Sequence, residues 1–261
     1  MSEDILKILI KDHPLNEEED FCALSAATYL SDMIYPAVLD RMDRLGSEDY
    51  FHVRADYDGF DLTIADDKYK VRALEIPSLS LFEKYLTDID VEVSVEWQEE
   101  GNDIFDVDGW LLTVDDEELC AAGLIYVVAK LPSDLVDAKR SLKSLKQEIV
   151  SVLMHEFRHA VQRNLWGWKN LESMALCDHM KNPAEIDARV EEICSYSYKP
   201  VRNMQLDEFE ALALKYIKKY LLRNAKELSL HEFNDHCDNL MKTHVAHFLK
   251  RQKVSEFIEP Q

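Results

Sequence analysis

Glycine, proline and paired cysteines are scarce in this chain. It has six Gly and seven Pro in 261 residues, whereas average usage is roughly 7% for Gly alone. Turn-rich β architectures and Gly-rich phosphate loops are therefore disfavoured. The five Cys contain no CxxC pair, which argues against a thiolate zinc cage and against a disulfide framework. We expect free thiols in a reducing compartment.

Long apolar runs are also missing. No stretch approaches the roughly 20 apolar residues that span a bilayer, and the first four residues, Met1-Ser2-Glu3-Asp4, lack the basic residues that open a signal peptide. The sequence thus predicts a cytoplasmic protein without membrane contact.

Basic residues are fewer than acidic residues in this chain. Thirty Lys and Arg stand against 51 Asp and Glu, for a formal net charge of −21. Such a chain repels phosphate backbones, so direct nucleic-acid binding is not expected. An acidic surface that engages a basic partner, or that imitates DNA, is the alternative that this charge leaves open. Hydrophobic residues make up 47% of the chain, enough for a substantial core.

The first half of the chain predicts a helix followed by a sheet. Asn16 to Glu19 resembles a capping box before a helix that runs to Gly46 with a kink at Pro36. Short runs typical of antiparallel strands follow at 50–53, 60–64, 69–74 and 91–97. Residues 98–118 hold nine acids and no Lys or Arg. We interpret this segment as an acidic loop and hairpin in preference to a cation or partner site.

The second half predicts one strand and then helices. A β-branched run at 123–131 closes at Pro132, and Ser133 or Asp134 can cap a long helix that ends near Gly167. Helical spacing returns at 205–225, and a capping box at 229–232 opens a last helix toward residue 251. We expect an α+β fold, with an N-terminal helix and β-rich region at 1–122 and a catalytic region at 123–261 that ends in a helical subdomain. The two parts are expected to form one continuous domain.

The long helix carries an HExxH motif, His155-Glu156-Phe157-Arg158-His159. Four residues advance a helix by slightly more than one turn, so both imidazoles project from one face and can hold one Zn²⁺. Glu156 sits beside that face, where its carboxylate can reach a metal-bound water. The flanking residues are strongly apolar, which predicts a core-packed helix where unpaired His and Glu would be costly.

A third ligand is expected from a second helix. Asn182 and Pro183 are typical of a helix start and place Glu185 in the first turn. Asp187 or Arg189 can then orient a ligand through a hydrogen bond or ion pair.

This combination of HExxH with a later Glu-x-Asp-Ala pattern resembles the gluzincin branch of the zinc metallopeptidases. The resemblance covers about residues 123–192 and implies a zincin-like fold, with an antiparallel or mixed sheet packed on a central HExxH helix. It implies zinc on His155, His159 and Glu185, with Glu156 as general base. It also implies that Gly123–Leu131 is the edge strand that binds an extended peptide. The metzincin signature, with a third His at fixed spacing, is absent.

Peptide hydrolysis also requires a donor to the tetrahedral oxyanion. The candidates are Tyr196, Tyr198, His179 and His231. A competing metal motif, HExxxH, spans His231 to His236, but its five-residue spacing needs a distorted helix, and capping already explains Glu232.

The sequence therefore predicts a zinc metallopeptidase that acts on a peptide or protein substrate. The alternative is a non-catalytic acidic binding or inhibitor protein with a structural or vestigial zinc site. No other cofactor is expected, and the sequence leaves the oligomeric state open.

Overall fold

The computed structural model describes residues 23–32, 35–36, 51–55, 61–64, 67–70, 89–97, 105–113, 123–132, 135–166, 182–224 and 228–256. The chain divides into two compact units, Cys22–Asn164 and a second made of Met1–Phe21 and Leu165–Gln261. We call them the sheet unit and the helical unit, and each is described by itself. The expected boundary between residues 122 and 123 lies inside the sheet unit.

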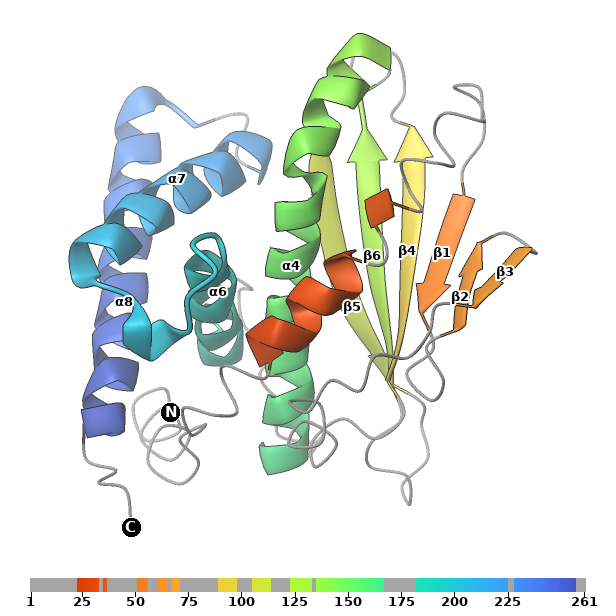
Figure 1. The fold of residues 1–261 in the computed structure, drawn as a ribbon. Helices are drawn as coiled ribbons and strands as arrows, with labels where there is room; N and C mark the ends of the chain where they lie inside the picture. Colours follow the sequence, from red (N-terminus) through yellow and green to blue (C-terminus); the bar gives the residue numbers. More distant parts are fainter. Residues whose placement is uncertain are drawn as a thin grey trace. The chain divides into compact units, whose positions relative to one another are not determined.

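The sheet unit contains a six-stranded mixed sheet (Figure 1). Its strands are β1 (Phe51–Ala55), β2 (Asp61–Ile64), β3 (Asp67–Lys70), β4 (Ile89–Trp97), β5 (Asp106–Thr113) and β6 (Gly123–Leu131). They follow the order β3-β2-β1-β4-β6-β5. Neighbours are antiparallel except β4 and β6, which are parallel. Strands are present near each predicted position, although the run predicted at 69–74 overlaps β3 only at its first two residues and otherwise lies outside the described residues. The mixed α+β class is confirmed.

The expectation that Gly123–Leu131 is an edge strand is wrong. The strand lies between β4 and β5, so both of its edges are already paired. The edge position belongs to β5, which comes from the acidic segment that we interpreted as a loop and hairpin. Strand pairing is non-local, so the apolar pattern of β6 alone could not reveal which segment would cover its second edge.

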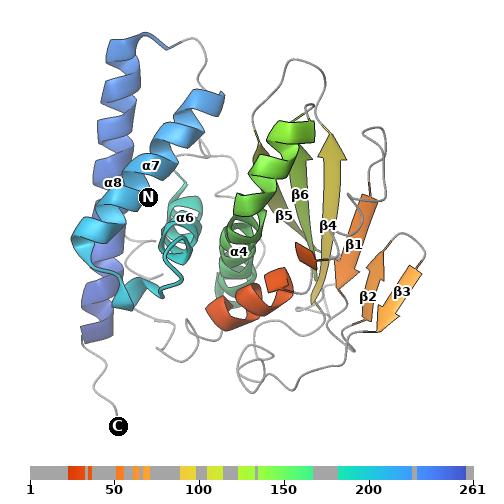
Figure 2. The same cartoon turned by 45° about the horizontal axis from the view of Figure 1, so that its top comes forward.

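Helix α4 (Leu135–Trp166) lies along one face of this sheet (Figures 1 and 2). Val127 of β6 lies opposite Gly109 of β5, which approaches Val152 of α4, so this face of the sheet faces α4. Val127 and its alternate neighbours Ile125 and Ala129 are fully buried. The helical segment 23–32 also packs on α4, because Ser31 Oγ donates a hydrogen bond of 2.9 Å to the Lys146 carbonyl. The HExxH helix is therefore held on two sides, as its apolar flanks predicted.

In its described part, the helical unit contains four helical elements, which Figure 2 shows. They are α6 (Pro183–Ser195), the 3₁₀ turn η1 (Val201–Asn203), α7 (Leu206–Asn224) and α8 (Leu230–Glu256). Their shared core includes Val190, Ile193, Phe209 and Phe248, and the two Phe rings stack at a centroid distance of 4.1 Å. The predicted helices and the capping box are confirmed, since Ser229 Oγ and Glu232 exchange hydrogen bonds.

Some predictions fall outside the described residues. These are the capping box at Asn16–Glu19, the extension of the first helix to Gly46 and the position of His179. Among the helices that the structure describes, none combines the length and apolar character needed to cross a membrane.

Candidate metal centre

His155 and His159 lie side by side on α4. Their Nε2 atoms are 2.9 Å apart, and their rings meet edge to face with centroids at 4.6 Å. Both residues are half-buried, whereas Leu153 and Phe157 on the same helix are buried against the core. The HExxH spacing therefore does what we expected: packing fixes the helix, and two imidazole nitrogens converge on one point.

Gln162 fixes the ring state of His159. Its side-chain oxygen lies 2.9 Å from His159 Nδ1, and Gln162 is fully buried. An amide oxygen only accepts hydrogen bonds, so Nδ1 carries the proton and the Nε2 lone pair is available to a metal. We did not predict this residue. The signal was a polar residue three positions after His159, on the same helical face in an apolar stretch.

Glu156 is 4% exposed and lies under the edge strand β5. A Cβ atom built on Gly109 of β5 would lie 3.5 Å from Glu156 Cγ and only 2.2 Å from Val152 Cγ1. Only glycine lets the strand approach the helix this closely. The edge strand thus lies against the side chain of Glu156, whose carboxylate we expect to act as the base.

Glu185 lies in the first turn of α6, as predicted. Asn182 caps the helix, since its side-chain oxygen accepts a hydrogen bond of 2.9 Å from the Ala184 N–H, and Pro183 occupies the first helical position. The side chain of Glu185 is 14% exposed. The cap explains the placement: Pro183 fixes the start of the helix, and the start fixes the direction of residue 185.

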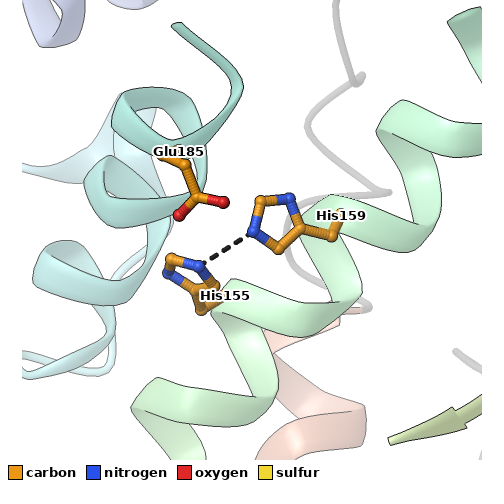
Figure 3. Close-up of side chains that lie close together, drawn as sticks. All are labelled: His155, His159 and Glu185. Atoms are coloured by element: carbon orange, nitrogen blue, oxygen red, sulfur yellow. Dashed lines mark hydrogen bonds between the residues drawn. The ribbon is translucent and has the colours of Figure 1, made fainter. Parts of the chain in front are cut away.

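The structure groups His155, His159 and Glu185, each half-buried, with ligand atoms within 4.8 Å of one another (Figure 3). The close-up shows both imidazoles and the carboxylate turned toward one another. Two imidazole nitrogens and one carboxylate are a typical donor set for catalytic zinc, with ligand distances of about 2.0–2.2 Å. By the chemistry of their donor atoms, these residues fit a bound metal.

The two residues expected to orient ligands have separate partners. Arg189 is 2% exposed, and its Nη2 lies 3.8 Å from Glu185 Oε2. Its guanidinium also lies over the ring of Tyr220, at 5.5 Å from the centroid. Asp187 is 4% exposed and accepts a hydrogen bond of 2.9 Å from His247 Nε2 on α8. Arg189 therefore pairs with Glu185 itself, and Asp187 ties α6 to α8.

The three candidate oxyanion donors that the structure describes lie elsewhere in the helical unit. Tyr196 is the C-cap of α6, about 16 Å along the helix axis from Glu185 at 1.5 Å per residue. Tyr198 is 44% exposed with a positive φ of 51°. His231 is exposed and pairs with Asp235 at 3.3 Å. It stands about 24 Å along α8 from His247, so Tyr196 and His231 do not reach Glu185.

The competing HExxxH motif does not form a metal group. His231 and His236 are both exposed on α8, and in the described part of the chain only the His155 group meets the geometry for a metal. His244 and His247 are buried. They have structural partners, because His244 Nδ1 donates to the Leu240 carbonyl at 2.8 Å and His247 contacts Asp187.

Comparisons with known proteins identify no relative. No family model matches the chain, and neither the curated proteins nor the solved structures contain a match. The function must therefore be argued from the site.

Proposed function

We propose that the protein is a zinc-dependent metallopeptidase. The observation that carries the proposal is the group of His155, His159 and Glu185 together with the buried Glu156 beside it. A structural zinc site is usually closed by four protein ligands, whereas three ligands leave a position for water. A carboxylate next to that position can serve as a general base for the bound water.

Each residue of the group has its own role in the proposed reaction. His155, His159 and Glu185 would hold the ion, which lowers the pKa of a bound water toward about 7 and polarises a carbonyl. Glu156 accepts a proton from the attacking water and delivers it to the departing amine nitrogen. Gln162 keeps His159 in the tautomer whose Nε2 faces the ligand group.

The edge strand supports a peptide as substrate. β5 is at the end of the sheet, and among the described strands only β6 pairs with it. A free strand edge can add an extended peptide through main-chain hydrogen bonds. Gly109 brings this edge against Glu156, so a peptide paired with β5 would present its backbone carbonyls beside the base. The net charge of −21 favours cationic substrates.

Elemental analysis of the purified protein tests the metal site. About one zinc per chain is expected for wild type, and His155→Ala and Glu185→Ala should each lose it. Absence of zinc in the wild-type protein after supplementation would overturn the proposal.

A peptide-library cleavage screen tests the activity, with Glu156→Gln as the matched control. This substitution keeps the size of the side chain and removes its basicity, so zinc should stay bound. Activity should fall by about 10²–10⁴-fold. A zinc-loaded wild-type protein that cleaves nothing, or a Glu156→Gln variant that is fully active, would contradict the peptidase assignment.

A further inference from the structure

Helix α6 carries an unusual density of buried charge. Asp187, Arg189, Glu191 and Glu192 are each at most 9% exposed, although α6 is only 13 residues long. Burying ionised groups costs free energy of desolvation, and apolar residues of similar size commonly stabilise a helix as well or better. Stability alone therefore does not explain these residues.

Two side chains of α8 hold one face of α6. His247 Nε2 donates a hydrogen bond of 2.9 Å to Asp187 Oδ1, and Arg251 Nη1 lies 3.6 Å from the same oxygen. Arg251 Nη2 also donates to Glu191 Oε1. His247 is 5% exposed and the Arg251 side chain 10%. Hydrogen bonds between ionised groups are strong and directional, and Arg can serve two carboxylates from its planar fork.

The spacing of these contacts resists both rotation and sliding of α6. Asp187 and Glu191 are four residues apart, so they lie one turn apart on one face of the helix. Glu185 precedes Asp187 by two residues, which places it about 200° around the axis, on the opposite face. α8 thus holds the back of the helix whose front carries the proposed zinc ligand.

Small rotations of α6 would matter at the metal. A rotation of about 20° displaces a carboxylate about 6 Å from the helix axis by roughly 2 Å. Metal–ligand distances tolerate only about 0.2 Å. Hydrogen bonds and ion pairs are directional, so they restrict the rotation of a helix beyond what apolar packing does.

We infer that His247 and Arg251 are positioning residues for the metal centre: by clamping Asp187 and Glu191 they set the orientation of α6 and so aim the Glu185 carboxylate. This inference rests on the proposed function, because it assumes that Glu185 is a metal ligand. It adds two residues of α8, both more than 60 positions beyond Glu185 in sequence, to the parts of the chain that determine metal affinity.

Zinc affinity, measured by competition with a chromophoric chelator, tests the inference. His247→Leu and Arg251→Met should weaken Zn²⁺ binding by about 10–100-fold, the usual cost of losing a group that orients a ligand. His247→Gln places an amide N–H where Nε2 lies, so it should restore most of the affinity. Arg251→Lys keeps the charge but not the fork and should give an intermediate value.

Phe248→Leu is the matched control. Phe248 is fully buried on the same turn of α8, but it packs against Phe209 and makes no ion pair. Urea unfolding of each variant reports its loss of stability. If His247 and Arg251 have a purely structural role, zinc affinity should fall with stability in all variants. If they position Glu185, Phe248→Leu should keep its zinc affinity even when it loses as much stability as the His247 and Arg251 variants.

The Co²⁺-substituted protein supplies an independent readout. Its visible absorption reports the ligand geometry at saturating metal, and the spectrum should change in Arg251→Met but not in Phe248→Leu. Wild type that binds no zinc overturns the metal centre and this inference together. Wild type that binds zinc, with unchanged affinity and spectrum in the His247 and Arg251 variants, overturns this inference alone.

Discussion

The two helices that supply the proposed ligands are held in different ways. Around the histidine pair, α4 buries apolar side chains such as Ile149, Leu153 and Phe157. Around Glu185, α6 buries charged ones, and Asp187 and Arg189 have ionic partners. Imidazoles one turn apart on a packed helix converge through their spacing, and a hydrogen bond to Gln162 orients one of them. A single carboxylate on its own helix has no second ligand beside it, so its direction needs charge and hydrogen bonding to define it.

The packing of α4 gives the largest expected effect. Leu153 is fully buried, and Leu153→Ala should lower the free energy of unfolding by about 2–5 kcal/mol, because a cavity replaces lost contacts. Urea unfolding measures the loss. Zinc affinity of the folded variant should change little, since apolar contacts do not set the direction of either imidazole. A variant that loses zinc while it stays folded would show that packing aims the ligands of α4.

The second prediction concerns His244 of α8, a buried histidine whose pKa is influenced by the charged residues Arg189 and Glu192 of α6. Burial, together with the positive charges of Arg189 and His247, lowers the pKa of His244 from 6.5 to about 4, although the Leu240 hydrogen bond and Glu192 act in the opposite direction. A pKa below the unfolded value means that the unfolded chain binds the proton more tightly. The stability from neutral His244 is therefore complete above about pH 6.5 and is lost as the pH falls toward 4.

Between pH 6.5 and 4, the free energy of unfolding should fall by on the order of 3 kcal/mol, because each unit of pKa shift corresponds to about 1.36 kcal/mol. Urea unfolding at several pH values should show it in wild type. His244→Asn keeps a donor for the Leu240 carbonyl but has no titratable ring, so its stability should depend less on pH between 4.5 and 6.5. Equal pH dependence in both proteins would contradict the assignment.

The third prediction concerns Gln162 and asks whether the orientation of the α4 histidines depends on packing alone. Gln162→Leu keeps an apolar stem of similar size and removes the acceptor for His159 Nδ1. Zinc affinity should fall by about 10-fold, at the lower end of the usual range, with little change in unfolding. A loss as large as that of Arg251→Met would remove the contrast between the helices, because both would then depend on hydrogen bonds.

Local patterns made part of the molecule predictable. The i,i+4 spacing of His155 and His159 is contained within one helix, and Asn182-Pro183 defines the helix start that places Glu185. Pairings between distant segments were not predictable. β5 covers the edge of β6, and His247 reaches Asp187 across 60 residues of sequence. The periodicity of a single sequence does not indicate which distant segments pair. The edge position was therefore assigned to the wrong strand, and the contacts of His247 and Arg251 with α6 were not predicted.

The smallest expected effect concerns a helix end that has no ionic link to α6. Ser229 and Glu232 form the capping box of α8, with Ser229 Oγ donating to Glu232 Oε2 at 2.6 Å. Ser229→Ala should cost about 1 kcal/mol of unfolding free energy, because a first-turn N–H loses its acceptor. The change lies about 27 Å along α8 from His247, so zinc affinity should equal that of wild type. If it falls, α8 transmits a general loss of helix stability to the metal, and the specific role of His247 and Arg251 is overturned.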